Sequence, residues 1–87
     1  MKILFSEQAW SEYLYWQSTD KRMIRKINTL IKDIARHPNK GLGKPEMLKH
    51  DLAGLWSRRI DQEHRLVYRA GEDELRIYSC RFHYGAD

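Results

Sequence analysis

The strongest constraint on this fold is an apolar stripe at helical spacing in the first half of the chain, closed by a proline. The stripe consists of Met23, Ile24, Ile27, Leu30, Ile31 and Ile34. This spacing aligns apolar side chains along one side of a helix, while charged residues fill the opposite side. Pro38 disfavours helical dihedrals at the residue before it, so the helix must end near Arg36. We expect an amphipathic helix that starts around Lys21 and packs on another element.

A short strand and a first helix are expected ahead of that stripe. Residues 2–5 favour a strand, and Ser6 followed by Glu7 is typical of a helix start, with a capping oxygen and an acid in the first turn. Asp20 interrupts the helical spacing and offers a new N-cap. The large aromatic residues of this helix exceed what one of its faces can bury: Trp10, Tyr13, Tyr15 and Trp16. Some of them are therefore expected to face a partner protein, and Trp10 and Trp16 favour a homodimer.

The part of the chain after Pro38 is rich in strands. The runs that favour strands span residues 46–49, 55–61, 64–70 and 74–83. Short links between the last three favour antiparallel neighbours, so we expect a meander. A chain of 87 residues has room for one domain. The prediction is a single α+β domain over residues 1–87, with a short N-terminal strand and two helices packed on one face of an antiparallel sheet.

Period-two counting assigns the strand side chains to the two faces of the sheet. It groups Ser57, Arg59 and Asp61 on one strand, Arg65, Val67 and Arg69 on the next, and Ser79, Arg81 and His83 on the last. We expect these sets to meet on one exposed face. Leu75 and Ile77 share the parity of His83 but suit the core, so a bulge or a strong twist must separate them from it.

Basic residues change type along the chain. All lysines lie at or before Lys49, and the basic residues beyond it are arginines only: Arg58, Arg59, Arg65, Arg69, Arg76 and Arg81. The formal net charge of +4 favours polyanionic partners, and a guanidinium matches two phosphate oxygens at once. The pattern predicts phosphate recognition, while the alternative is a set of solvated strand faces that use arginine. Residues 39–45 form a loop of turn-forming residues that is expected to be flexible and positively charged.

The cysteine and histidine residues indicate where in the cell the protein functions and whether it binds a metal ion. Cys80 is the only cysteine, which excludes an intramolecular disulfide and favours the reducing cytoplasm. The apolar run after Lys2 is too short for a signal peptide or a membrane span, so no membrane partner is expected. His37, His50 and His64 lack metal-ligand spacing with one another or with Cys80. We expect neither a metal nor another cofactor.

RNA can be cut without a metal when its own 2′-hydroxyl attacks the adjacent phosphorus. A general base takes the hydroxyl proton, a cation stabilises the phosphoryl oxygens, and a general acid protonates the leaving 5′-oxygen. Glu46 opens a strand between Lys44 and Lys49 and is the candidate base. His83, beside Arg81, is the candidate acid because histidine exchanges protons near neutral pH. Taken singly, each is more often an ordinary surface or packed side chain.

Six short motifs form a more specific pattern. They are Asp-Lys-Arg at 20–22, Ile-Asn-x-Leu-Ile-Lys-Asp at 27–33, Gly-Lys-Pro-Glu-x-Leu-Lys-His at 43–50, Trp-Ser-Arg-Arg-Ile at 56–60, Glu-His-Arg-Leu-Val-Tyr at 63–68 and Cys-Arg-x-His-Tyr at 80–84. With them the chain resembles, end to end, the YoeB family of the RelE/ParE toxin superfamily. The resemblance implies a microbial-ribonuclease-like fold and a type II toxin-antitoxin toxin. Such a toxin cleaves messenger RNA at the ribosomal A site and halts translation.

The resemblance also implies roles for residues and partners. Glu46 resembles the family's general base, Arg65 its transition-state clamp and His83 its general acid. Further substrate contacts are expected from Lys44, Lys49, Arg59, Arg81 and Tyr84. The implied partners are messenger RNA, the ribosome, a YefM-like antitoxin and a second copy of the chain, with operator DNA bound only through the antitoxin complex. The family ends near the His-Tyr pair, whereas here residues 85–87 follow.

Two other functions use the same features. A non-catalytic nucleic-acid binder or co-repressor would need the basic face alone. A toxin on the same fold that poisons a DNA topoisomerase is the second alternative, because a fold does not define a function. An acid and a base among the arginines favour the nuclease, since a pure binder requires neither.

Overall fold

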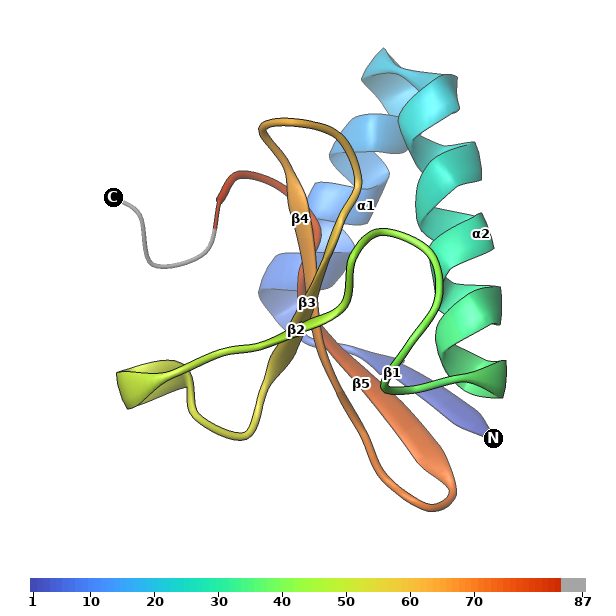
Figure 1. Cartoon of the computed structure of the whole chain (residues 1–87). Coiled ribbons are helices and arrows are strands. Elements are labelled where there is room, and N and C mark those ends of the chain that lie inside the picture. The colour runs from blue at the N-terminus through green and yellow to red at the C-terminus, as the bar shows by residue number, and fades with distance from the viewer. Residues whose placement is uncertain (84–87) are drawn as a thin grey trace.

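The computed structural model describes residues 1–83 and has two layers, a sheet and a pair of helices on one of its faces (Figure 1). The elements in chain order are β1 (Lys2–Phe5), α1 (Glu7–Thr19), α2 (Lys21–Arg36), β2 (Glu46–Met47), a 3-10 helix η1 (His50–Leu52), β3 (Trp56–Arg59), β4 (Arg65–Ala70) and β5 (Glu74–Ser79). The order in the sheet is β1-β5-β4-β3-β2. The α+β architecture and the antiparallel meander β3-β4-β5 are confirmed, and β1 joins β5 in parallel.

Both helices begin at the capping residues that the sequence predicts. The Ser6 hydroxyl accepts a hydrogen bond from the Ala9 N–H at 3.0 Å at the start of α1. The Asp20 carboxylate accepts one from the Arg22 N–H at 3.0 Å at the start of α2. These caps satisfy backbone donors that lack a partner inside the helix. The second helix ends shortly before Pro38, as expected.

The core lies between the helices and the sheet. The apolar stripe of α2 meets side chains of β3, β4 and β5 and of the residue after β3, and the buried members include Ile27, Leu30, Ile34, Ile60, Leu66, Tyr68, Leu75 and Ile77. Trp16 of α1 joins this core and its Nε1 donates a hydrogen bond to the Cys80 carbonyl at 2.8 Å. Trp10 is 49% exposed. Of the two tryptophans expected to face a partner, Trp16 is therefore unavailable, and that part of the prediction is wrong.

The expected bulge occurs in β5. Ile77 lies opposite Tyr68, but Ser79 lies opposite Val67, so Tyr78 is the extra residue at the shift in register. Ile77 therefore points into the core, and Ser79 points to the face without helices.

The last strand is shorter than the predicted 74–83 because Cys80 leaves the sheet. The Cys80 N–H donates to the Glu12 carboxylate at 2.8 Å, and the Cys80 carbonyl accepts a hydrogen bond from Trp16 Nε1. Side chains of α1 thus replace the neighbouring strand as partners of this peptide. The predicted strand 46–49 is also shorter and ends at Met47.

A buried arginine anchors the loop between α2 and β2. Arg58 is fully buried and donates to the carboxylate of Asp33 on α2 at 2.5 Å and to three carbonyls of the loop, those of His37, Lys40 and Leu42. At Gly41, whose φ is +118°, a Cβ atom would lie 2.2 Å from the Asp33 carboxylate, so only glycine fits. The loop is thus held in place, in contrast to the flexible loop that its composition predicts.

Candidate active site

The face of the sheet without helices carries the candidate base. Glu46 lies opposite Ser57, Ser57 opposite Val67, and Val67 opposite Ser79. Residues paired across strands project from the same face, so these four side chains form one row. Glu46 is exposed at the β2 end of this row and lines a cavity of about 410 Å³ together with Lys49. The structure therefore brings the candidate base and one predicted phosphate contact together.

The next row contains two arginines. Arg59 lies opposite Arg65, two residues along β3 from Ser57 and on the same face. Arg59 is exposed, but Arg65 is only 7% exposed. The expectation that the predicted side chains of these strands meet on one exposed face is confirmed for Arg59 but wrong for Arg65, and Ser57 and Val67 are also buried.

Backbone carbonyls explain why Arg65 is buried. Its Nη1 donates to the carbonyls of Asp61, Gln62 and His64 at 2.9, 3.2 and 3.2 Å. The guanidinium is thus fixed against the turn between β3 and β4. A guanidinium fixed in this way loses little freedom when it binds an anion with its remaining N–H groups.

The candidate acid borders the first row at its Ser79 end. His83 is exposed and lines a cavity of about 580 Å³ with Val67 and Ser79, two members of the Glu46 row. The same cavity is lined by Ser6, Glu7 and Gln8, so His83 lies at the Ser79 end of the row, beside the start of α1. Tyr84, the predicted nucleotide contact, lies outside the described residues.

The remaining predicted substrate contacts, Lys44 and Arg81, lie in different parts of the molecule. Lys44 and Arg59 line a groove of about 660 Å³ that runs beside α2, where Arg25 and Lys26 add positive charge. The Arg81 guanidinium carbon lies 3.6 Å from the centre of the Tyr15 ring of α1. Arg81 is therefore stacked on a helix rather than projecting from a strand.

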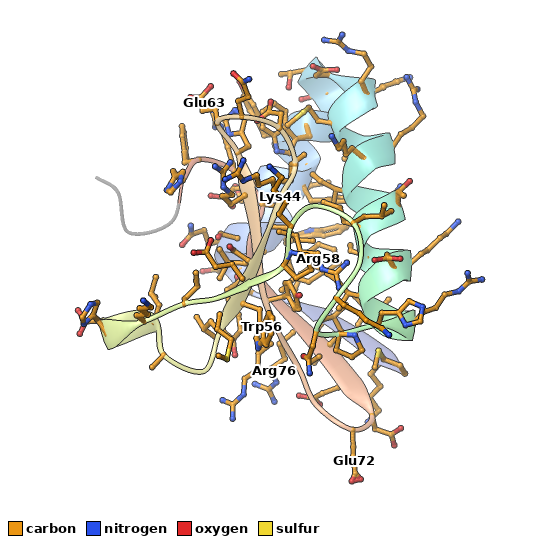
Figure 2. All side chains as sticks on the ribbon, viewed as in Figure 1. Lys44, Trp56, Arg58, Glu63, Glu72 and Arg76 are labelled. Atoms are coloured by element: carbon orange, nitrogen blue, oxygen red, sulfur yellow. The ribbon has the colours of Figure 1, made fainter. Side chains whose placement is uncertain are left out.

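One of the arginines predicted to recognise phosphate serves the fold instead, and another is paired with a neighbouring carboxylate. Arg58 is the buried anchor of the loop, and Arg76 forms an ion pair with Glu74. In Figure 2, Arg58 lies near Lys44, whereas Arg76 lies toward Glu72 and the β4–β5 hairpin. Period-two counting could have identified Arg58 as a structural residue, because it puts the Arg58 side chain on the other face of the strand from Arg59, toward the core.

Electrostatics supports a structural role for Arg58. The backbone N–H of Leu42 and then the Arg58 guanidinium hold the pKa of Asp33 below its ordinary value. Burial, with a hydrogen bond from Arg58 acting against it, raises the pKa of Tyr68, whose hydroxyl accepts from Arg58 and donates to the Pro38 carbonyl. Asp33 thus stays ionised as a partner of Arg58, and Tyr68 stays neutral.

Within residues 1–83, no group of three or more His, Cys, Asp and Glu side chains is arranged to hold a metal ion. None of the helices described in that range is long and apolar enough to cross a membrane.

Comparison with known proteins is consistent along almost the whole chain. Residues 5–84 match the family model of the YoeB-like toxin of bacterial type II toxin-antitoxin systems. Toxin YoeB of Escherichia coli (strain K12) is 61% identical over 97% of this chain and 100% of its own length. The YoeB/ParE toxin from Agrobacterium tumefaciens superposes with a TM-score of 0.93 at 53% identity, covering 97% of this chain and 100% of that chain.

Two structures from Staphylococcus aureus show related assemblies. One is a YoeB dimer, with a TM-score of 0.91. The other is a heterotetrameric YoeB-YefM toxin-antitoxin complex, with a TM-score of 0.90. Both are 49% identical to this chain and cover 97% of it and 98% of their own chains. The chain therefore belongs to the YoeB family of toxins of bacterial type II toxin-antitoxin systems.

Proposed function

We propose that this toxin is a metal-independent endoribonuclease that cuts messenger RNA at the ribosomal A site in the cytoplasm and so inhibits translation. Glu46 removes the proton of the 2′-hydroxyl, and the 2′-oxygen attacks the adjacent phosphorus. The P–O5′ bond then breaks, and His83 donates a proton to the departing oxygen. The products are a 2′,3′-cyclic phosphate and a 5′-hydroxyl, and the reaction as proposed uses neither an oxidant nor a metal ion.

The observation that carries this proposal is the register of β2, β3 and β4. Glu46 is opposite Ser57, and Arg59 and Arg65 form the next pair on the same face. Glu46 and Arg59 are diagonal neighbours on adjacent strands, a placement that separates residues by about 7–8 Å, and Arg65 lies one strand further away on β4. A carboxylate followed by a guanidinium on each of the next two strands supplies a proton acceptor and a clamp for the phosphoryl oxygens.

The remaining contacts follow from their positions. Lys49 shares a cavity with Glu46, and Lys44 shares a groove with Arg59. We assign both lysines to the RNA backbone, because ammonium groups bind phosphate without reading the base. Tyr84 and Arg81 remain candidates for nucleotide placement.

The family supports two protein partners, a YefM-like antitoxin and a second copy of the chain. Exposed apolar side chains on the helix side of β1 and on α1 suit such contacts, and this patch comprises Ile3, Trp10 and Leu14, each at least 40% exposed. We assign this patch to the homodimer. Operator DNA is reached only through the antitoxin complex in this proposal.

The test is to map cleavage of a defined messenger RNA on translating ribosomes with purified toxin. We expect cuts at the codon in the A site and 5′-hydroxyl ends. A 5′-phosphate product would refute the mechanism. RNA binding without cleavage would favour a non-catalytic nucleic-acid binder. Inhibition of a DNA topoisomerase without RNA cleavage would favour a topoisomerase-poisoning toxin.

A histidine pair provides the matched control. His83→Gln should lose cleavage by at least about a hundredfold with an unchanged circular dichroism spectrum, because an amide donates no acidic proton. His37→Gln should cleave like the wild type, since His37 is an exposed side chain at the end of α2. Equal activity of the two variants would remove His83 from the mechanism.

A further inference from the structure

His64 is a buried histidine to which the proposed chemistry gives no role. It is 9% exposed, and its ring packs edge-on against Trp16 of α1 with 4.8 Å between ring centres. Its Nδ1 accepts a hydrogen bond from the backbone N–H of Phe82 at 2.7 Å, and its Nε2 lies 3.5 Å from the Glu63 carboxylate. A nitrogen that accepts carries no proton, so the imidazole is neutral with its proton on Nε2.

The carbonyl of Phe82 is held as well. The Arg65 N–H donates to the Phe82 carbonyl at 3.0 Å, so two consecutive residues of the chain fix both polar groups of Phe82. In Figure 1 the last described residues pass beside the start of β4, as these bonds require. The next residue after this anchored peptide is His83, the proposed acid.

Phe82 would not adopt this conformation without support. Its φ is +66°, in the left-handed region, where a bulky residue is strained by roughly 1–3 kcal/mol. The residue is also 52% exposed, so burial of the ring contributes little to holding it. The Phe82 ring contacts the His64 ring and the Arg81 guanidinium, but the backbone of the turn is held by the hydrogen bonds that Phe82 makes with His64 Nδ1 and the Arg65 N–H.

The start of this segment is anchored as well. Glu12 and Trp16 of α1 bind the N–H and the carbonyl of Cys80. These contacts fix where the chain leaves the sheet, but they act two residues before Phe82. The direction in which the chain continues toward His83 is set at Phe82.

We propose that His64, as a neutral imidazole, is a positioning residue for RNA cleavage: its Nδ1 holds the Phe82 peptide so that His83 is presented to the leaving 5′-oxygen. The inference rests on the proposed function. It also ties the acid to the clamp, because the Arg65 backbone N–H binds the Phe82 carbonyl while the Arg65 guanidinium serves the phosphate. Substrate binding does not depend on this bond, whereas the proton transfer does.

Two substitutions of His64 distinguish the effect of its hydrogen-bond acceptor from the effect of the space that its ring fills. In His64→Asn the amide oxygen takes the position of Nδ1 and accepts the Phe82 N–H, while His64→Leu fills the space without an acceptor. We expect His64→Leu to lower kcat about tenfold or more with KM within about twofold, which is the effect of one lost hydrogen bond on the positioned state. His64→Asn should recover most of kcat, and His37→Leu should behave like the wild type.

A spectroscopic measurement tests the hydrogen bond independently of RNA. An N–H···N bond transmits a scalar coupling between its two nitrogens, so ¹⁵N NMR should show a coupling between the Phe82 amide and His64 Nδ1 in the wild type. Absence of this coupling, or a proton on Nδ1, would overturn the inference. Full activity of His64→Leu, or equal loss in His64→Leu and His64→Asn, would overturn it too. If the wild type cut no RNA while the coupling was present, the proposed function would fail instead.

Discussion

Arg58 of β3 and Asp33 of α2 form an ion pair with 2.5 Å between Nη1 and Oδ2, which joins the sheet to the helix layer beneath the loop that leads to Glu46. The arginine is wholly buried, and its remaining N–H groups reach the Tyr68 hydroxyl and the loop carbonyls. A charged side chain is thus a central packing element of this small fold. Because the loop is bound to it, the position of the candidate base depends on a residue that touches no substrate.

Replacing Arg58 with methionine should destabilise the protein strongly. Methionine has a similar length but removes the hydrogen bonds that the buried guanidinium donates to the Asp33 carboxylate and to the carbonyls of Lys40 and Leu42, and hydrogen bonds of charged groups contribute about 1.5–3 kcal/mol each. We expect the free energy of unfolding in urea to fall by at least about 3 kcal/mol. The neighbouring Arg59→Met, at an exposed position, should change it by less than about 0.5 kcal/mol. Equal effects of the two variants would contradict the role of Arg58.

The Asp33 carboxylate should make stability depend on acid pH. Its folded pKa lies below the ordinary value of 3.8, because the Leu42 N–H and Arg58 favour the charged form. Such a group contributes stability above its unfolded pKa and loses that contribution as the pH falls through the folded pKa. The stability difference between the wild type and Asp33→Asn should therefore narrow from pH 6 to pH 3, as measured by urea unfolding. A difference that stays constant over this range would be inconsistent with the pair, and Asp73→Asn is the exposed control.

Local patterns predicted the elements of this fold better than their long-range contacts. The caps at Ser6 and Asp20, the stripe of α2 and the bulge before Ser79 all follow from short-range periodicity. The role of Arg58 does not, because its partner Asp33 is distant in sequence and the choice between phosphate and a carboxylate of α2 depends on packing.

The candidate site shows the same division. Period-two counting predicted that Arg59 and Arg65 share a face, and their cross-strand pairing confirms it. It could not predict that the Arg65 guanidinium donates to three backbone carbonyls. Nor could it predict that side chains of α1 bind the backbone N–H and carbonyl of Cys80, where β5 ends. Both outcomes depend on backbone groups, which carry no mark in the side-chain sequence. The pairing of β1 with β5 was likewise not predicted.

Cys80 should be unreactive in the folded protein. Burial, together with the nearby Glu12 carboxylate, raises the pKa of its thiol to about 12, and its Sγ donates to the Ala9 carbonyl. Since the thiolate is the reactive form, labelling with a disulfide reagent at pH 8 should be at least about a hundredfold slower in the native protein than in urea. Equal labelling rates in the two states would show that Cys80 is accessible.

Trp10 should control the proposed homodimer. Its side chain is 49% exposed and stacks on Tyr13 with 5.8 Å between ring centres, so it forms a rigid aromatic surface. We expect Trp10→Ala to weaken the dimer by about 2 kcal/mol or more, which is roughly thirtyfold in Kd, by sedimentation equilibrium. Leu42→Ala removes an equally exposed apolar side chain from a different surface and should leave the dimer intact. A dimer unaffected by Trp10→Ala would exclude the patch as its interface.

Arg65 should be required for catalysis as a guanidinium and not only as a positive charge. Its Nη1 bonds fix the group against the turn carbonyls, so lysine at this position keeps the charge but loses the planar fork and part of the anchoring. We expect Arg65→Lys to lower kcat for RNA cleavage by about a hundredfold, the typical cost of removing one preorganised donor at a developing oxyanion. Arg69→Lys is the matched control, because Arg69 is exposed on the same strand and face. Urea unfolding should accompany the kinetics, since Arg65→Lys also weakens the turn by roughly 1 kcal/mol. Full activity of Arg65→Lys would reduce this residue to a structural support of the turn.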